Sequence, residues 1–165
     1  MARFVPADFD VPVRLETPDF LIRMLAITDV VKDYDAVMSS VEHLRGVFGP
    51  GGRWPQGLSF EQDLIDLGWH QKEFQRRRSF AYTVMSLDES QCLGCLYIEP
   101  TTLPGYDAEV FCWIRASHAA DLDGRLYDTL RAWIEAQWPF RAVAYRGRAM
   151  SWEKFAALKA VAEGG

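Results

Sequence analysis

The three cysteines are the residues of this sequence whose type and spacing most directly suggest chemistry. Cys92-Leu-Gly-Cys95 has the spacing of a redox or metal-binding pair. The pair lies in an apolar run typical of a β-strand, where residues three apart face opposite sides of the sheet. His43, His70 and His118, which could complete a metal site, are scattered along the chain. Cys112 has no general base beside it to make it a nucleophile. We therefore expect diverging thiols, buried as small hydrophobic side chains, and no metal.

Two segments rich in turn residues carry side chains that could contact a ligand. Residues 46–58 are dense in Gly and Pro and include Trp54, which we expect to be exposed and interpret as a substrate contact. A plain connection between two helices is the alternative. The segment Tyr145-Arg-Gly-Arg148 places two cations at the end of a predicted strand, where ligands of open α/β sheets gather. A solvated turn would give the same pattern.

Hydrophobic periodicity divides the chain into the strands and helices that must position these residues. Apolar runs predict strands at residues 20–25, 80–85, 92–98, 108–114 and 141–145. Helical spacing predicts helices from Thr28 to near Gly46, after Ser59, at about 122–137 and at 152–161. Ser59 and Gln62 form a capping-box pattern, which marks the start of the second helix.

The order of these elements indicates the fold class. Three consecutive strands joined by short connections favour antiparallel pairing, as in a hairpin. The final strand–helix–strand unit requires at least one parallel pair and a right-handed crossover. We therefore predict one α/β (α+β) domain over residues 1–165, with a mixed, mostly antiparallel sheet flanked by helices.

Composition narrows the classes of function. The chain has 165 residues, of which 49% are hydrophobic, and a formal net charge of −5. The acidic balance argues against a nucleic-acid binder. No run approaches the roughly 20 apolar residues that cross a bilayer, so we expect no membrane partner. An odd number of cysteines and no secretory leader predict a cytoplasmic protein with reduced thiols.

Three segments carry a resemblance to a known family: residues 92–100, residues 107–115 and residues 122–140. In their order and spacing they are similar to the third strand, the fourth strand and the following helix of the GNAT superfamily of CoA-dependent N-acyltransferases. The resemblance covers about residues 12–160. It implies a GNAT-like sheet that ends after the fourth helix, without the two terminal strands common in the superfamily. A second chain could complete the acceptor site, which would make the protein a homodimer.

The resemblance implies a site for acetyl-CoA as co-substrate. The backbone of Cys112, Trp113 and Ile114 would hold pantetheine, and the following segment would bind the pyrophosphate at a helix N-terminus. That segment supplies Arg115, Ser117, His118, Ala119, Ala120, Asp121, Leu122 and Arg125. The superfamily usually places glycines here, whereas this chain has Ala119 and Asp121 in their place, so its pyrophosphate loop is degenerate. Alternatively, the carboxylates of Asp121 and Asp123 cap the helix.

The resemblance also implies catalytic roles. Glu109, near the start of the fourth strand, would act as the general base that deprotonates the amine, with an edge salt bridge as the alternative. Alternation along the strand places Glu109, Phe111 and Trp113 on one face. Glu99 is a second candidate that would contact the substrate, or it is merely solvated. No tyrosine lies on the last helix to protonate the leaving thiolate, and Tyr145 is a possible substitute or a packing residue.

Two hypotheses about function follow. The first is transfer of an acetyl or other acyl group from CoA to a primary amine of a small-molecule acceptor. The second is a non-catalytic GNAT-like protein that binds a small ligand or a partner in the cleft left by the splayed strands. The Glu109 strand favours the first hypothesis, and the glycine-poor loop favours the second.

Overall fold

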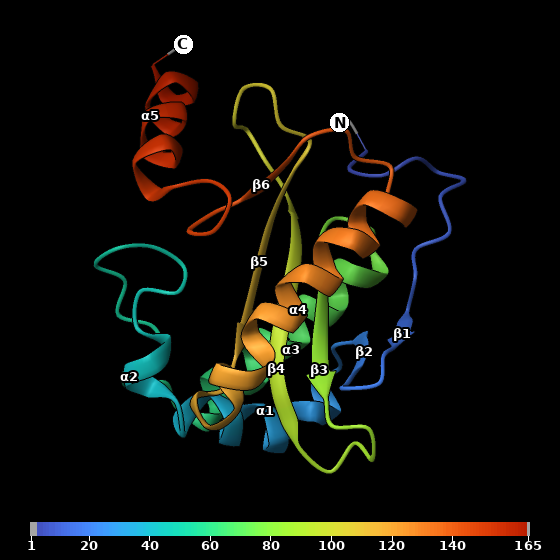
Figure 1. The fold of residues 1–165 in the computed structure, drawn as a ribbon, viewed down its shortest axis with the longest axis vertical. Helices are drawn as coiled ribbons and strands as arrows, with labels where there is room; N and C mark the ends of the chain where they lie inside the picture. Colours follow the sequence, from blue (N-terminus) through green and yellow to red (C-terminus); the bar gives the residue numbers. More distant parts are fainter. Residues whose placement is uncertain (1–2, 165) are drawn as a thin grey trace.

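A six-stranded sheet forms the centre of the protein in a computed structural model that describes residues 3–164 (Figure 1). The strands lie side by side in chain order: β1 (Arg14–Glu16), β2 (Leu21–Met24), β3 (Phe80–Met85), β4 (Cys92–Pro100), β5 (Ala108–Ile114) and β6 (Val143–Tyr145). The helices are α1 (Val30–Met38), α2 (Val41–Leu44), α3 (Phe60–Gln75), α4 (Ala116–Gln137) and α5 (Trp152–Glu163), with a 3₁₀ turn at Ile27–Asp29. The predicted α/β class with helices flanking the sheet is confirmed.

Neighbouring strands of the sheet pair in both directions. β1 to β5 pair antiparallel through turns or excursions that reverse the chain, whereas β5 and β6 pair parallel. Helix α4 makes the long crossover that a parallel pair requires. The prediction of a mixed, mostly antiparallel sheet with one parallel pair is therefore confirmed.

Each face of the sheet is covered by helices because side chains alternate along the strands. Leu96, Ile98 and Val110 point toward α4 and pack in one core with Leu130 and Trp133 of that helix. The opposite face carries α1 and α3, which pack against β4 and β3 respectively. Figure 1 shows α4 in front of the sheet and α1 and α3 behind it. The face toward α1 and α3 carries the acidic and aromatic side chains described below.

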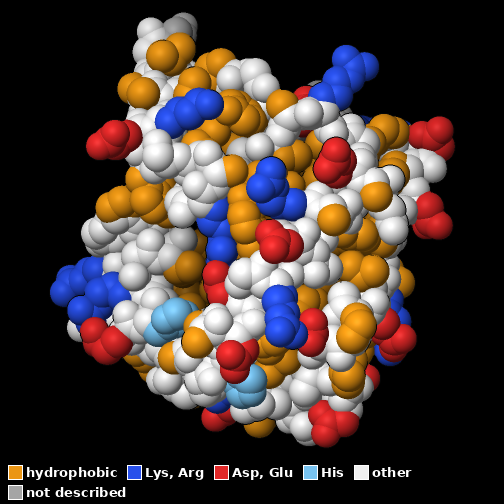
Figure 2. Space-filling view, in the orientation of Figure 1, with side chains coloured by type: hydrophobic (Ala, Val, Ile, Leu, Met, Phe, Trp, Pro, Cys, Tyr) orange, Lys and Arg blue, Asp and Glu red, His pale blue; other side chains and the backbone are white. Residues whose placement is uncertain are grey.

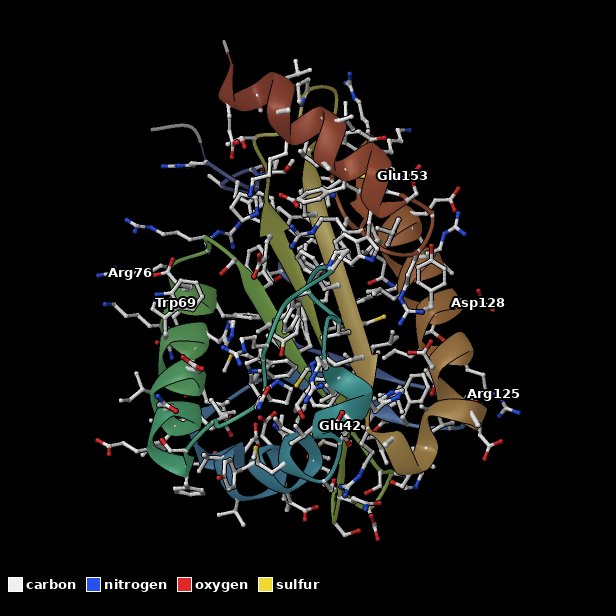
Figure 3. All side chains as sticks on the ribbon, turned by 90° about the vertical axis from the view of Figure 1, so that its left-hand side faces the viewer. Glu42, Trp69, Arg76, Arg125, Asp128 and Glu153 are labelled. Atoms are coloured by element: carbon white, nitrogen blue, oxygen red, sulfur yellow. The ribbon has the colours of Figure 1, made fainter. Side chains whose placement is uncertain are left out.

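The 46–58 segment lies against this second face. Figure 3, turned by 90° from Figure 1, shows the loop in front of the strands, between α3 and α4. Phe48 of the loop packs on Tyr97 and Phe111, with ring centroids 5.7 and 5.8 Å apart. Trp54 is half-buried and packs on Phe48 and Trp113. The expectation that Trp54 is exposed is therefore wrong: its ring closes over the aromatic surface of the sheet.

The two C-terminal elements diverge from the sheet. β6 pairs only with residues 108–110 of β5, and beyond that point the two strands separate (Figure 1). Helix α5 has no buried residue and contacts the rest through a small cluster that includes Leu103 and Met150. This separation opens the sheet beside the second half of β5.

Several boundaries differ from the predictions. Residues 14–16 form β1, where no strand was predicted, and the last strand begins at Val143 rather than at residue 141. The helix expected from Thr28 to near Gly46 is divided, because the chain turns at Ser39–Ser40 between α1 and α2. The capping box at Ser59 and Gln62 is confirmed. No helix among residues 3–164 is long and apolar enough to cross a membrane.

Candidate functional site

A cavity of about 370 Å³ lies between the sheet, α1, α3 and the 46–58 loop. Its walls are mostly aromatic and its polar groups are mostly acidic. The lining residues are Leu25, Asp33, Phe48, Trp54, Asp63, Asp66, Leu67, Trp69, His70, Tyr97, Glu99, Phe111 and Arg146. Small-molecule sites are typically apolar cavities with a few convergent polar groups, and this one combines aromatic rings with an unusually large share of charged side chains.

Glu99 lines one end of this cavity, and a second carboxylate, Glu109, lies beside it outside the lining. Glu99 of β4 and Glu109 of β5 are directly opposed across the antiparallel pair, on the face that also carries Tyr97 and Phe111. Burial raises the pKa of Glu99, the nearby Arg146 cation lowers it in part, and Glu109 raises it further. The expected alternation of Glu109, Phe111 and Trp113 on one face is confirmed by the register of the pair.

Arg146 connects the carboxylates to the separated strands. Its Nε lies 3.2 Å from Oε1 of Glu109, an ion pair outside hydrogen-bond geometry. Its guanidinium lies over the rings of Phe111 and Phe155, 3.8 and 4.4 Å from their centroids. A cation held between two rings and a carboxylate has little freedom, so Arg146 fixes the orientation of Glu109. The salt bridge that was the alternative role of Glu109 is present, and its partner Arg146 lines the cavity.

The other end of the cavity holds three aspartates. Burial raises the pKa of Asp63 to about 6 and also raises the pKa of Asp66. Asp33 is 3% exposed, and its carboxyl group contacts that of Asp63, whose Oδ2 has no hydrogen-bond partner in the described chain. Burial lowers the pKa of His70 to about 4, so this imidazole is neutral at physiological pH. The cavity is therefore acidic, and a cationic ligand would relieve the repulsion between its carboxylates.

A second cleft of about 240 Å³ lies where β5 and β6 separate. Arg148 spans it: its guanidinium donates to both carboxylate oxygens of Asp123 on α4, at 2.9 and 2.8 Å, and to the backbone oxygen of Cys112 at 3.3 Å. Figure 2 shows basic and acidic side chains among hydrophobic ones on this face, along a groove between the 46–58 loop and α4. The backbone of β5 that was expected to hold pantetheine thus already has two side-chain partners, because His43 Nε2 also lies 3.1 Å from the backbone oxygen of Ile114.

Helix α4 begins at Ala116, directly after β5, and not at residue 122 as predicted. The backbone N–H of Ala116 donates to Ser40 Oγ at 2.9 Å. The guanidinium of Arg115 donates hydrogen bonds to Asp35 Oδ2 and Ser39 Oγ, at 3.0 and 2.9 Å. The alanine-rich start of the segment has high helix propensity and no glycine to interrupt it, so it continues the helix.

This early start changes the place of the residues expected to bind pyrophosphate. Ser117, His118, Ala119, Ala120, Asp121, Leu122 and Arg125 lie within the first turns of α4 rather than in a loop. Asp121 and Asp123 do not cap the helix, because they lie inside it. Arg125 pairs with Asp19 at 2.9 Å and points outward in Figure 3. The structure therefore does not bring this set together around a common point.

Cys92 and Cys95 face the same side of the sheet, and the expectation that they diverge is wrong. The register of β3 and β4 shifts between Val84, opposite Gly94, and Met85, opposite Cys92. This bulge inserts one residue and so reverses the alternation on one side of it. A Cβ at Gly94 would overlap the backbone oxygen of Trp113, so only glycine allows this close approach of β4 to β5.

Comparison with known proteins gives structural relatives only. No family model matches the sequence, and no curated protein matches it. The ribosomal-protein-S5-alanine acetyltransferase from Vibrio fischeri superposes with a TM-score of 0.65 at 19% identity, over 92% of this chain and 82% of that one. RimL, a ribosomal L7/L12 α-N-protein acetyltransferase in complex with coenzyme A, gives 0.58 at 17% identity, over 76% and 66%. The microcin C7 self-immunity acetyltransferase MccE, in complex with acetyl-CoA and AMP, gives 0.54 at 8% identity, over 73% and 63%.

The chain has the GNAT fold. The GNAT fold is thus confirmed, while the residues of the site are described by this structure alone.

Tyr145 lies apart from the paired glutamates within this fold. Its strand partner is Val110, whose side chain points toward α4, and its ring packs edge-to-face on Tyr127 of that helix at 5.7 Å. Burial raises the pKa of Tyr145 to about 12. Since Glu109 faces the opposite side of the sheet, these contacts favour the packing alternative for Tyr145.

The sequence did not lead us to the three aspartates at one end of the cavity, Asp33, Asp63 and Asp66. Asp33 follows Val30 by three residues and precedes Val37 by four, so it lies on the apolar stripe of α1. A carboxylate on such a stripe is the signal that could have marked it. Asp63 and Asp66 gave no comparable signal, because acidic residues are common in the first turns of a helix.

Proposed function

We propose that the protein transfers an acyl group, with acetyl as the simplest case, from a CoA thioester to a primary amine bound in the 370 Å³ cavity. The observation that carries this proposal is the opposed pair of Glu99, which lines the cavity, and Glu109, which forms an ion pair with Arg146 of the cavity wall. The GNAT fold supports it, since its solved relatives include acetyltransferases in complexes with coenzyme A and acetyl-CoA.

Glu109 is proposed as the proton acceptor. An amine reaches the cavity as an ammonium ion and attacks a carbonyl only after losing a proton. Arg146 orients the Glu109 carboxylate, and the neighbouring Glu99 provides a second negative charge against the ammonium. The raised pKa of Glu99 also suits it to share the proton. In the transfer the amine nitrogen bonds to the acyl carbon, the carbon–sulfur bond breaks, and the thiol of CoA leaves.

The acceptor is proposed to be a small cationic amine. The cavity combines the carboxylates of Asp63, Asp66 and Glu99 with the rings of Trp69 and Phe48. Aromatic faces and carboxylates both attract ammonium groups, the rings by about 0.5–2 kcal/mol each. A neutral or anionic amine compound would gain neither interaction.

The donor side fits a thioester arm better than a pyrophosphate. The 240 Å³ cleft beside Cys112 has room for a pantetheine arm once the Arg148 side chain moves aside. The first N–H of α4, however, already donates to Ser40, and residues 117–122 are helical. Because these groups do not fit a pyrophosphate in the expected place, we assign no residue to it.

The test combines a titration with an activity assay. Acetyl-CoA is titrated calorimetrically into the protein with desulfo-CoA alongside, and amines are then screened by release of the CoA thiol. We expect acetyl-CoA binding and thiol release that depends on a cationic amine, with release lost in Glu109→Gln. Binding of neither CoA compound up to millimolar concentration would refute acyl transfer.

A second candidate is binding of a cationic amine without catalysis. It is favoured because the proposed site for the CoA thioester is already occupied by side chains: Ser40 accepts from the first N–H of α4, and Arg148 spans the 240 Å³ cleft. The same titration distinguishes the two, because this candidate predicts amine binding in the absence of any interaction with acetyl-CoA.

A further inference from the structure

The bulge in β4 gathers three metal-ligating side chains under α1. The sulfur atoms of Cys92 and Cys95 and a carboxylate oxygen of Asp33 all lie within 4.8 Å of one another. Cys95 Sγ donates to Asp33 Oδ1 at 3.3 Å, and Cys92 Sγ lies 3.6 Å from Thr83 Oγ1. Asp33, Cys92 and Cys95 are all buried, with at most 3% of their surfaces exposed. This cluster is separate from the Glu99–Glu109 pair.

A charged carboxylate at the buried position of Asp33 lowers the stability of the fold unless a cation lies beside it. Cys92 and Cys95 belong to a core cluster with Leu21, Val37 and Met85, and an uncompensated charge there costs several kcal/mol. Asp33 forms no ion pair with Lys or Arg anywhere in residues 3–164. Its neighbour Asp63 adds a second carboxyl, whose Oδ2 has no hydrogen-bond partner among residues 3–164.

We propose that Cys92, Cys95 and Asp33 bind one zinc ion, with the fourth position directed toward Asp63. Zinc takes sulfur and oxygen ligands in a tetrahedron, with roughly 2.3 Å to sulfur and 2.0–2.2 Å to oxygen. Those bond lengths place neighbouring ligand atoms roughly 3.3–3.8 Å apart. Cys95 Sγ and Asp33 Oδ1 are already 3.3 Å apart, and all three ligand atoms lie within 4.8 Å of one another. Magnesium and calcium prefer six or more oxygen ligands, and the two thiols exclude them.

The surroundings suit such a site. The backbone oxygen of Cys92 accepts from Arg115 Nη1 at 3.2 Å, which fixes the start of β4. Gly94 lies at the bulge that turns both thiols to one side, and its lack of a side chain allows β4 to approach β5 closely. Asp33 and Asp63 line the 370 Å³ cavity, which gives the ion an entry path. Bound zinc would join α1 to β4 and, through Asp63, to α3. Binding releases the two thiol protons and any carboxyl proton to the buffer.

The first experiment measures zinc on the purified chain. The protein is stripped with a chelator under a phosphine reductant, and Zn²⁺ is returned by titration. We expect one equivalent per chain and a higher thermal midpoint. Cys92→Ser and Cys95→Ser should lose the zinc, whereas Cys112→Ser should retain it. Cys112 is the matched control, since it is equally buried but its side chain faces α4.

The second experiment needs no variant and so does not depend on whether a serine variant folds. Co²⁺ is added to the stripped wild-type chain and its absorption spectrum is recorded. We expect thiolate-to-cobalt charge transfer in the near ultraviolet and the intense visible bands of tetrahedral coordination. Less than about a tenth of an equivalent of zinc, a cobalt spectrum without thiolate bands, or equal zinc loss in Cys112→Ser and Cys92→Ser would each overturn the proposal. None of these measurements depends on acyl transfer.

Discussion

Asp63→Asn should make the metal-free protein more stable at pH 8 and leave its stability unchanged at pH 4. Asp63 is 4% exposed, its Oδ2 has no partner among the described residues, and burial raises its pKa from 3.8 to about 6. The folded protein therefore binds a proton that the unfolded chain releases between about pH 4 and pH 6. Stability consequently falls as pH rises through that window, and the penalty persists above it.

The size of the penalty follows from the same values. A rise from 3.8 to about 6 corresponds to at most about 3 kcal/mol, at about 1.4 kcal/mol for each pH unit. Because Asp33 contacts Asp63 and takes part of the shared proton, we reduce this to about 1–2 kcal/mol. In a chain of this size that corresponds to a thermal midpoint higher by roughly 3–6 °C.

The assay is thermal and urea unfolding at pH 4 and pH 8, in the presence of a chelator. Asp128→Asn is the matched control, since Asp128 is exposed on α4 and points to solvent (Figure 3). Asp66→Asn should give a smaller gain, because Asp66 is less buried than Asp63. Destabilisation by Asp63→Asn at pH 8 would refute the reasoning, since it would mean that the carboxylate has a partner.

Three further predictions concern the cleft and its supports. Glu109→Gln should lower kcat for the best amine by about 100-fold or more, whereas Glu99→Gln should mainly raise the KM for that amine. An equal fall of kcat in both variants would refute the assignment of Glu109 as the base. Arg148→Ala should tighten acetyl-CoA binding by about 5–10-fold in calorimetry, because the Arg148–Asp123 ion pair, worth about 1 kcal/mol, no longer has to break. The control Arg125→Ala should leave acetyl-CoA affinity unchanged. Gly94→Ala should cost about 2–3 kcal/mol in urea unfolding, since the added Cβ meets a backbone oxygen, and a cost under about 0.5 kcal/mol would show that β4 and β5 can separate there.

The fold could be predicted because its signals are local. The apolar runs of β3, β4 and β5 and the capping box of α3 each depend on residues within one element. The start of α4 could not be located from the sequence in the same way. Its first N–H is satisfied by Ser40, which is 76 residues away along the chain. A cap supplied from another element leaves no pattern beside the helix that it caps.

The thiols show a second limit of sequence reasoning. Strict alternation places Cys92 and Cys95 on opposite faces, and that rule is right for an unbroken strand. One inserted residue at the bulge reverses it, and the only local sign is Gly94 between them. A glycine inside an apolar strand indicates either a bulge or a close approach of another backbone, and here it is both.

The 240 Å³ cleft proposed for the acyl donor and the 370 Å³ cavity proposed for the amine differ in whether their polar groups already have hydrogen-bond or ion-pair partners. On the donor side, Arg148 is paired with Asp123, and the first N–H of α4 is paired with Ser40. On the acceptor side, Asp63 Oδ2 has no partner within the described chain, and the neighbouring carboxylates repel one another. A ligand binds most readily where it replaces an unfavourable arrangement and not an existing bond. In the metal-free protein an amine can therefore enter without rearrangement, whereas a thioester must first displace Arg148. If acyl transfer occurs, binding of the amine should not require the acyl donor, and calorimetry with each ligand alone measures this directly.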